Sequence, residues 1–123
     1  NEMEKMSYKT FVWPQNPHFY HEETSREAVY EKNEAGEDVF KGMGLMKRTI
    51  TAEGVFFGEG ASSQYQKLEK LFENTEPGDL EHPVWGIRYC YLTGLELTQE
   101  PKENCVAYKV VFQQAMANGI LPK

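Results

Sequence analysis

This chain of 123 residues carries 19 acidic and 13 basic side chains, and its net charge of −6 argues against duplex DNA or an anionic membrane as a partner, since both are bound through basic surfaces. A composition of 40% hydrophobic and 13% aromatic residues excludes intrinsic disorder and favours strands over a helix bundle. All apolar runs are far shorter than the roughly 20 residues of a transmembrane helix.

The length predicts a single domain over residues 7–123, preceded by a disordered or loosely ordered end over residues 1–6. Cys90 and Cys105 are too few for a disulfide framework. The turn expected between the last two strands also leaves them out of register with each other. We therefore expect two free thiols, consistent with a reducing cytoplasm.

The first half of the chain predicts short extended segments. In chain order these are a strand over residues 7–13, a turn over 14–17, short strands over 18–23 and 27–31, and a polar loop over 33–37. In the first strand, alternation places Tyr8 and Val12 on one face and Phe11 and Trp13 on the other. Residues 16–46 carry the weakest pattern.

A longer strand is predicted over residues 47–57, rich in Thr, Ile, Val and Phe. Gly54 interrupts it and marks either a bulge or a close backbone approach. Phe56 and Phe57 must point to opposite faces, so one of them belongs either to a second core layer or to a contact surface. Gly58 then breaks the strand by allowing a positive φ angle.

One amphipathic helix is predicted over residues 61–74. Its apolar stripe consists of Ala61, Tyr65, Leu68 and Phe72, with Leu71 beside them. Ser62 and Ser63 are candidate caps for its start, and Pro77–Gly78 follows its end.

The last part of the chain predicts an antiparallel hairpin of strands over residues 87–99 and 105–113. Alternation places Tyr89, Tyr91, Leu95 and Leu97 on one side of the first strand, and Val106, Tyr108, Val110 and Phe112 on one side of the second. A short helical turn is expected within residues 115–123. The order of elements indicates a mainly-β or α+β fold: a small antiparallel β-sandwich or barrel with one packed helix.

No residue pattern indicates catalysis. Cys90 lies within a strand, where a thiol is usually buried and inert. His18 and His21 would lie on opposite faces of a strand and therefore cannot chelate one metal ion. The acidic pairs come without a sign of a sugar-binding cleft. We therefore predict that the chain is not an enzyme and needs no cofactor or metal.

An ordered set of motifs resembles a known family. It comprises Gly44, Arg48, the run Glu53–Gly58, Tyr65, Leu68, Leu71–Phe72 and the block Pro77–Gly86. Together with the opening Tyr8–Pro14 and the closing Tyr108–Phe112, it resembles the N-terminal domain of the phage DNA-circularisation proteins and related tail or baseplate proteins of Mu-like phages and prophages. The Pro-Gly-x-Leu-x-His-Pro block is the most specific part.

The resemblance implies a structural component of a phage or prophage-derived tail or baseplate, formed in the bacterial cytoplasm and then carried in the particle. Its partners would be other tail or baseplate proteins, with further copies of itself as a homo-oligomer and no direct contact with nucleic acid or membrane. The candidate structural or interface residues are Trp13, Gly54, Phe56, Phe57, Gly58, Gly78, His82, Pro83 and Trp85.

Two of these candidates have specific expected roles. His82 is expected to hydrogen-bond a backbone carbonyl and hold its loop, and Trp85 to anchor that loop in the core. The alternative function is a small ligand- or carbohydrate-binding module without catalytic activity. An enzyme, an assembly chaperone or an adaptor are weaker alternatives.

Overall fold

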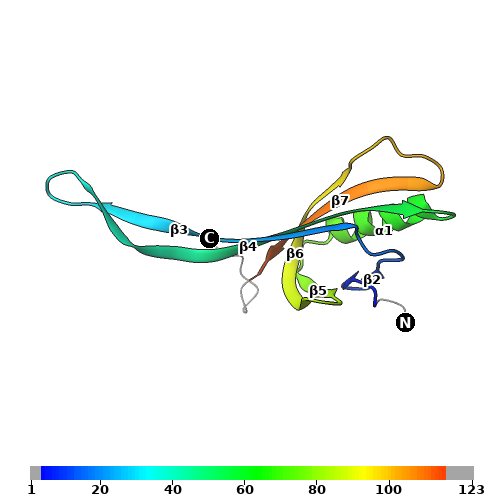
Figure 1. Cartoon of the computed structure of the whole chain (residues 1–123), viewed down its shortest axis with the longest axis horizontal. Helices are drawn as coiled ribbons and strands as arrows, with labels where there is room; N and C mark the ends of the chain where they lie inside the picture. Colours follow the sequence, from blue (N-terminus) through cyan, green and yellow to red (C-terminus); the bar gives the residue numbers. More distant parts are fainter. Residues whose placement is uncertain (1–3, 116–123) are drawn as a thin grey trace.

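Two long antiparallel strands, β3 (Phe19–Lys32) and β4 (Asp38–Phe57), run the length of the molecule in this computed structural model, which describes residues 4–115 (Figure 1). The other elements are β1 (Ser7–Tyr8), β2 (Phe11–Val12), α1 (Ala61–Glu73), β5 (Gly78–His82), β6 (Gly86–Leu97) and β7 (Cys105–Gln114). The seven strands form one antiparallel sheet in the order β2-β1-β5-β6-β7-β4-β3.

The β-rich class with one packed helix, predicted from the sequence, is confirmed. The strands lie in a single open sheet, however, and not in the two sheets of a sandwich or the closed ring of a barrel. The sheet curls strongly, so that Tyr20 of the edge strand β3 packs on His82 of β5, with ring centroids 4.4 Å apart. The core fills the concave face.

Strands β4 and β7 supply the centre of this core. Their register pairs Ile50 with Phe112 and Phe56 with Val106, and directly opposed residues share a face. The predicted alternation of β7 is confirmed, because Val106, Tyr108, Val110 and Phe112 are all buried.

The alternation predicted for β6 is wrong, and a bulge explains part of the difference. The buried residues at the start of the strand are Cys90 and Leu92, not Tyr89 and Tyr91. The ladder to β7 then shifts register between Leu92 and Gly94. This extra residue turns Leu95 toward the core, against which it packs half-buried.

Helix α1 begins and ends within one residue of its predicted bounds and packs on β4, β6 and β7. Ala61 and Leu68 are buried as expected, but Phe72 is 41% exposed. The serine caps are wrong: Gly60, at φ 88°, occupies the N-cap position, and no side chain caps the helix. No helix within residues 4–115 is long and apolar enough to cross a membrane.

The predicted first strand is instead a tight reversal. β1 pairs with β2 across Lys9 and Thr10, and Lys9 takes a positive φ of 53°. The turn breaks the alternation, so Phe11 and Trp13 join Tyr8 in the core while Val12 is exposed.

Two expectations concern the segments near the two ends of the chain. Met6, placed by the sequence in a loosely ordered end, is buried, and its N–H donates a 2.8 Å hydrogen bond to Asn16. The helical turn expected within residues 115–123 lies, except for Ala115, outside the described residues.

Candidate functional site: the projecting β3–β4 arm

The outer part of the β3–β4 hairpin projects beyond the rest of the sheet (Figure 1). β4 pairs with β7 only from Thr49 onward, so within residues 4–115 the stretch 38–48 has β3 as its single neighbouring strand. We call residues 24–48 the arm. The sequence predicted two short strands over 18–23 and 27–31, whereas β3 is continuous over this stretch.

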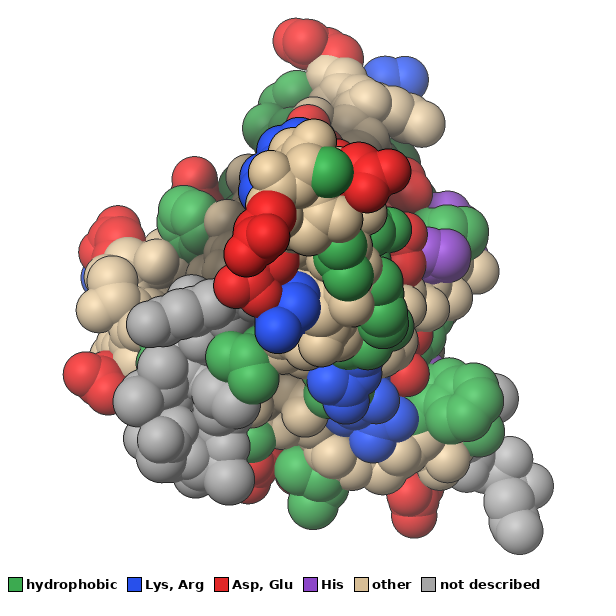
Figure 2. Space-filling model, turned by 90° about the vertical axis from the view of Figure 1, so that its left-hand side faces the viewer, with side chains coloured by type: hydrophobic (Ala, Val, Ile, Leu, Met, Phe, Trp, Pro, Cys, Tyr) green, Lys and Arg blue, Asp and Glu red, His purple; other side chains and the backbone are tan. Residues whose placement is uncertain are grey.

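Large apolar side chains line the arm without being covered by the body. Their exposed fractions lie between 43% and 60%, and the residues are Val29, Tyr30, Val39, Phe40, Met43 and Leu45. Tyr30 and Phe40 pack edge to face with ring centroids 5.9 Å apart. In Figure 2, where the arm points toward the viewer, apolar side chains lie beside acidic ones.

Both faces of the arm carry apolar groups. Tyr30 lies opposite Phe40, while the adjacent pair, Glu31 and Val39, faces the other way. A two-stranded ribbon alone is marginally stable in water. A ribbon with apolar side chains on two uncovered faces is therefore suited to contact with another chain.

The outer half of the arm is acidic. Residues 27–41 hold five acidic side chains and two lysines, a net charge of 2 − 5 = −3. Lys32 pairs with Asp38 at 2.8 Å and Lys41 with Glu31 at 3.0 Å. Within the described residues, Glu34 forms no ion pair. The sequence predicted the polar loop at 33–37, and there Asn33 accepts hydrogen bonds from two backbone N–H groups.

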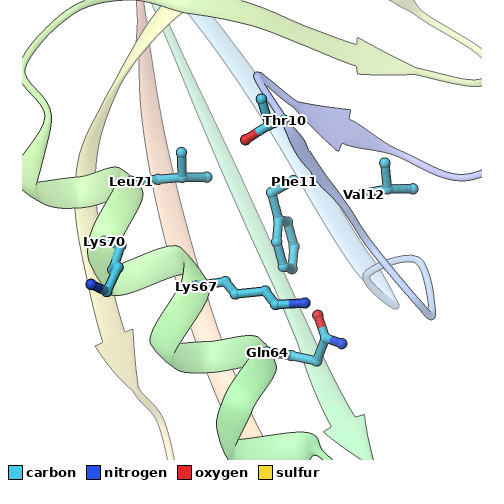
Figure 3. Close-up of a pocket in the computed structure, with 7 residues that line it drawn as sticks. All are labelled: Thr10, Phe11, Val12, Gln64, Lys67, Lys70 and Leu71. Carbon is cyan, nitrogen blue, oxygen red and sulfur yellow. The ribbon is translucent and has the colours of Figure 1, made fainter.

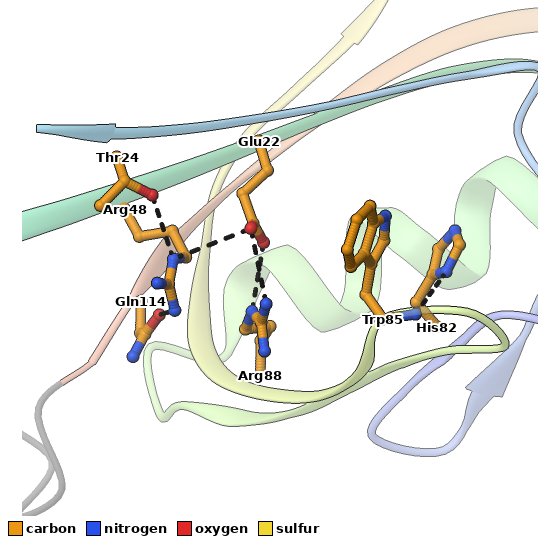
Figure 4. A network of polar contacts seen from close by, with 7 residues as sticks. All are labelled: Glu22, Thr24, Arg48, His82, Trp85, Arg88 and Gln114. Atoms are coloured by element: carbon orange, nitrogen blue, oxygen red, sulfur yellow. Dashed lines mark hydrogen bonds and ion pairs between the residues drawn. The ribbon is translucent and has the colours of Figure 1, made fainter.

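A polar cluster holds the base of the arm against the body (Figure 4). Arg88 of β6 donates to Glu22 of β3 at 3.1 Å, and the Arg48 guanidinium lies 3.9 Å from the same carboxylate. Arg48 also donates to Gln114 at 2.6 Å and to Thr24 at 3.3 Å. We call these five residues the base cluster.

The base cluster is partly shielded from water. The side chains of Glu22, Arg48 and Arg88 are only 21–23% exposed. Hydrogen bonding to Glu22 raises the pKa of Arg88 above its ordinary value, with burial acting against it. The cluster therefore fixes where the arm leaves the curled sheet. No sequence pattern indicates this cluster, because its members come from four strands and share no local motif.

The loop after β5 is built differently from the prediction. His82 Nδ1 accepts hydrogen bonds from the N–H groups of Val84 at 3.0 Å and Trp85 at 3.3 Å, and it does not donate to a carbonyl. The pKa of His82 is lowered by burial, which favours the neutral ring that such acceptance requires. Pro83 lies in the turn between β5 and β6.

Trp85 does not anchor this loop in the core, since it is 56% exposed. Val84, Ile87 and Tyr89, close to it in the sequence, are exposed as well. The His82 imidazole contacts the backbone N–H of Trp85, and Figure 4 shows both side chains extending from the same loop.

Trp13 and Gly54 meet at one point in the core. The Trp13 indole N–H donates to the Tyr108 hydroxyl at 2.8 Å, and the Tyr108 ring stacks on Phe56 at 4.4 Å. A Cβ atom on Gly54 would lie 2.5 Å from that hydroxyl oxygen. The ladder to β7 runs through Gly54 without a shift, so this glycine marks a close approach and not a bulge.

The other candidates divide between the core and the surface. Phe56 is buried and Phe57 is 59% exposed, which confirms that they face opposite ways. Gly58 has φ 89° and ends β4. Gly78 lies under the Lys9 side chain, whose ammonium donates to the Glu76 carbonyl at 2.6 Å.

The chemical groups considered in the sequence are dispersed. Within residues 4–115 no three His, Cys, Asp or Glu side chains come together as a metal site. Cys90 and Cys105 are both free, and burial raises the pKa of Cys90 to about 12. A thiol in that state is a poor nucleophile.

Comparisons with known proteins agree with the motif analysis. A family model described as DNA circularisation protein N-terminus matches residues 20–89, which include the whole arm. The family resemblance expected from the sequence is thereby confirmed. No curated protein matches the chain.

Two solved structures are similar in fold. One is from the "Virion of native gene transfer agent (GTA) particle", with a TM-score of 0.58, 13% identity, and coverage of 92% of this chain and 91% of that chain. Another is from the "Tail of empty GTA particle computed with helical refinement, C6 symmetry", with a TM-score of 0.52, 14% identity, and coverage of 82% and 78%.

Proposed function

The chain belongs to the DNA circularisation protein N-terminus family, and from that premise we propose that it is a structural subunit of a phage-like particle that joins its neighbours through the β3–β4 arm. The observation that carries the proposal is the arm itself. It is a projecting ribbon, apolar on both faces and anchored at its base by the base cluster.

The free energy of burying apolar side chains favours a contact between the arm and another chain. Complete burial of a fully exposed large apolar side chain contributes roughly 1.5–3 kcal/mol, so covering a half-exposed one contributes about half of that. Six such side chains lie on the arm, and they are exposed in the single chain. The energy of burying their remaining exposed surface is therefore available to assembly.

The fold comparisons point the same way. The two similar chains come from a virion and from a tail, and nearly the whole of this chain aligns with the first. Because identity is only 13–14%, the likeness concerns the arrangement of strands and helix. Assembly with other tail or baseplate proteins, including further copies of this chain, is part of the proposal.

In this proposal the chain acts by contact and not by catalysis. The buried Cys90 thiol has a raised pKa, the opposite of what an activated nucleophile requires. Partners are proteins and not nucleic acid, in line with the net charge of −6. Assembly takes place in the bacterial cytoplasm, after which the chain is carried in the particle.

Mass spectrometry of particles purified from producing cells tests this function. The chain is expected at a fixed ratio to the other tail components through successive density gradients. A cytoplasmic protein of similar abundance is the control and should be lost. Purified, intact particles that lack the chain would refute the proposal.

A further inference from the structure

A groove lies between the β1–β2 turn and helix α1, on the body of the molecule (Figure 3). Its volume is about 510 Å³, within the range of roughly 300–1,000 Å³ that holds compact ligands. The residues that matter for its chemistry are Phe11, Val12, Gln64, Lys67, Lys70 and Leu71. We call it the α1 groove.

The α1 groove combines an apolar lining with a basic rim. The largely buried Phe11 and the half-buried Leu71 supply the apolar lining, and the exposed lysines Lys67 and Lys70 line the groove from α1. In Figure 3 Lys67 extends toward Phe11, whereas the ammonium group of Lys70 points to the other side of the helix. Neither lysine forms an ion pair within the described residues, in contrast to Lys32 and Lys41 of the arm. The groove therefore suits a segment that is both apolar and acidic.

We infer that the α1 groove receives the outer arm, residues 27–41, of a second copy of this chain. The inference rests on the proposed function and names the partner surface of the arm. The outer arm has the matching chemistry: a net charge of −3, with Tyr30 and Phe40 as paired exposed rings. One or both rings would enter the groove while acidic groups meet Lys67 and Lys70.

The arm of the same chain cannot occupy the groove. The arm extends away from the body on the side opposite to α1 (Figure 1), and the base cluster holds it in that direction. The contact therefore joins two different surfaces on two copies. Such a head-to-tail contact builds a ring or a helical filament and not a two-fold dimer.

Site-specific photocrosslinking tests this contact. Phe40 is replaced by a benzophenone amino acid in the full chain, and crosslinks are mapped by mass spectrometry in particles and in purified protein at millimolar concentration. Crosslinks to residues 10–12 and 64–71 of another copy are expected. Mixing isotopically labelled and unlabelled chains shows that the two ends come from different copies.

Charge reversal supplies the matched control. Lys67→Glu with Lys70→Glu should reduce the crosslink about tenfold or more, as expected for close charge pairs across an interface. Lys102→Glu, an exposed lysine outside the groove, should leave it unchanged. The crosslink to a groove that carries Lys67→Glu and Lys70→Glu should be restored when the arm of the other copy carries Glu27→Lys and Glu34→Lys.

The outcomes separate this inference from the proposed function. If the chain is present in particles but Phe40 crosslinks to another surface or to another particle protein, the groove assignment is overturned and the proposed function stands. If Phe40 in particles crosslinks to nothing, both the groove assignment and the arm as the contact surface are overturned. Loss of the crosslink without rescue by the reversed arm also overturns it. If the chain is absent from particles, the proposed function fails.

Discussion

Glu22 of β3 and Arg88 of β6 form a 3.1 Å ion pair although their strands are not neighbours in the sheet. Two strands, β7 and β4, lie between them in the sheet order. Only a strongly curled sheet brings these side chains together. The pair thus ties the edge strand that carries the arm to the far side of the body.

Replacing Glu22 by Gln should destabilise the fold by about 1–2 kcal/mol. The change leaves Arg88 without its carboxylate partner in a partly shielded site. The expected destabilisation therefore lies between that of breaking an exposed ion pair and that of breaking a buried one. Urea unfolding measures the difference. Glu23→Gln, at an exposed neighbour, is the control and should cost less than about 0.5 kcal/mol. Equal effects of the two changes would contradict this account of the base cluster.

Gly54→Ala should destabilise the chain by about 1–3 kcal/mol, because the new Cβ would lie 2.5 Å from the Tyr108 hydroxyl oxygen. Tyr108→Phe removes that oxygen but leaves the Trp13 N–H without its acceptor. Combined, the two changes should cost less than the sum of the single costs. Strict additivity in denaturant unfolding would show that the close approach does not limit this position.

The two tryptophans should behave in opposite ways. Trp85→Ala should change the free energy of unfolding by less than about 0.5 kcal/mol, since the side chain is exposed. Trp13→Ala should cost about 3–5 kcal/mol, because it empties a fully buried site. Iodide should quench the fluorescence of Trp85 and leave Trp13 protected. A quenched Trp13 would contradict the core described above.

Stability should fall as the pH rises above about 9. Burial raises the pKa of Cys90 from 9.0 to about 12 and that of Tyr20 from 10.0 to about 12. In this window the unfolded chain loses protons that the folded chain retains, so the free energy of unfolding decreases. Burial raises the pKa values of Tyr8 and Tyr108 as well, which strengthens the effect.

Cysteine variants check the source of this alkaline effect. Cys90→Ala should flatten the decline in unfolding free energy between about pH 9 and pH 12, measured by urea titration. Cys105→Ala, at the exposed thiol, should leave the slope as it is. The same slope in all three proteins would rule out the buried thiol as a contributor.

Sequence patterns predicted the elements that have one buried face. Helix α1 and strand β7 show clear periodicity because the core selects every third to fourth or every second residue. The arm has no buried face, so residues 24–48 carry no such period and their extent was underestimated. The bulge at Thr93 has no local signal either, since Leu92 and Leu95 suit a strand in both registers.

Sequence patterns could predict only part of the candidate site. The opposite orientations of Phe56 and Phe57 follow from alternation alone. The role of Glu22 depends on a residue 66 positions away, and the curl that joins them is a property of the whole sheet. Trp85 was assigned to the core by residue type, although its loop turns it outward.

The most direct test of the account is particle incorporation of a chain with Tyr30→Ser and Phe40→Ser. Both rings are more than half exposed, so the isolated variant should keep a midpoint of thermal unfolding within about 2 °C of the native chain. Leu97→Ser, an exposed apolar position on the body, is the control. We predict that the arm variant falls at least tenfold in purified particles while the control does not. Full incorporation of the arm variant would contradict assembly through the arm.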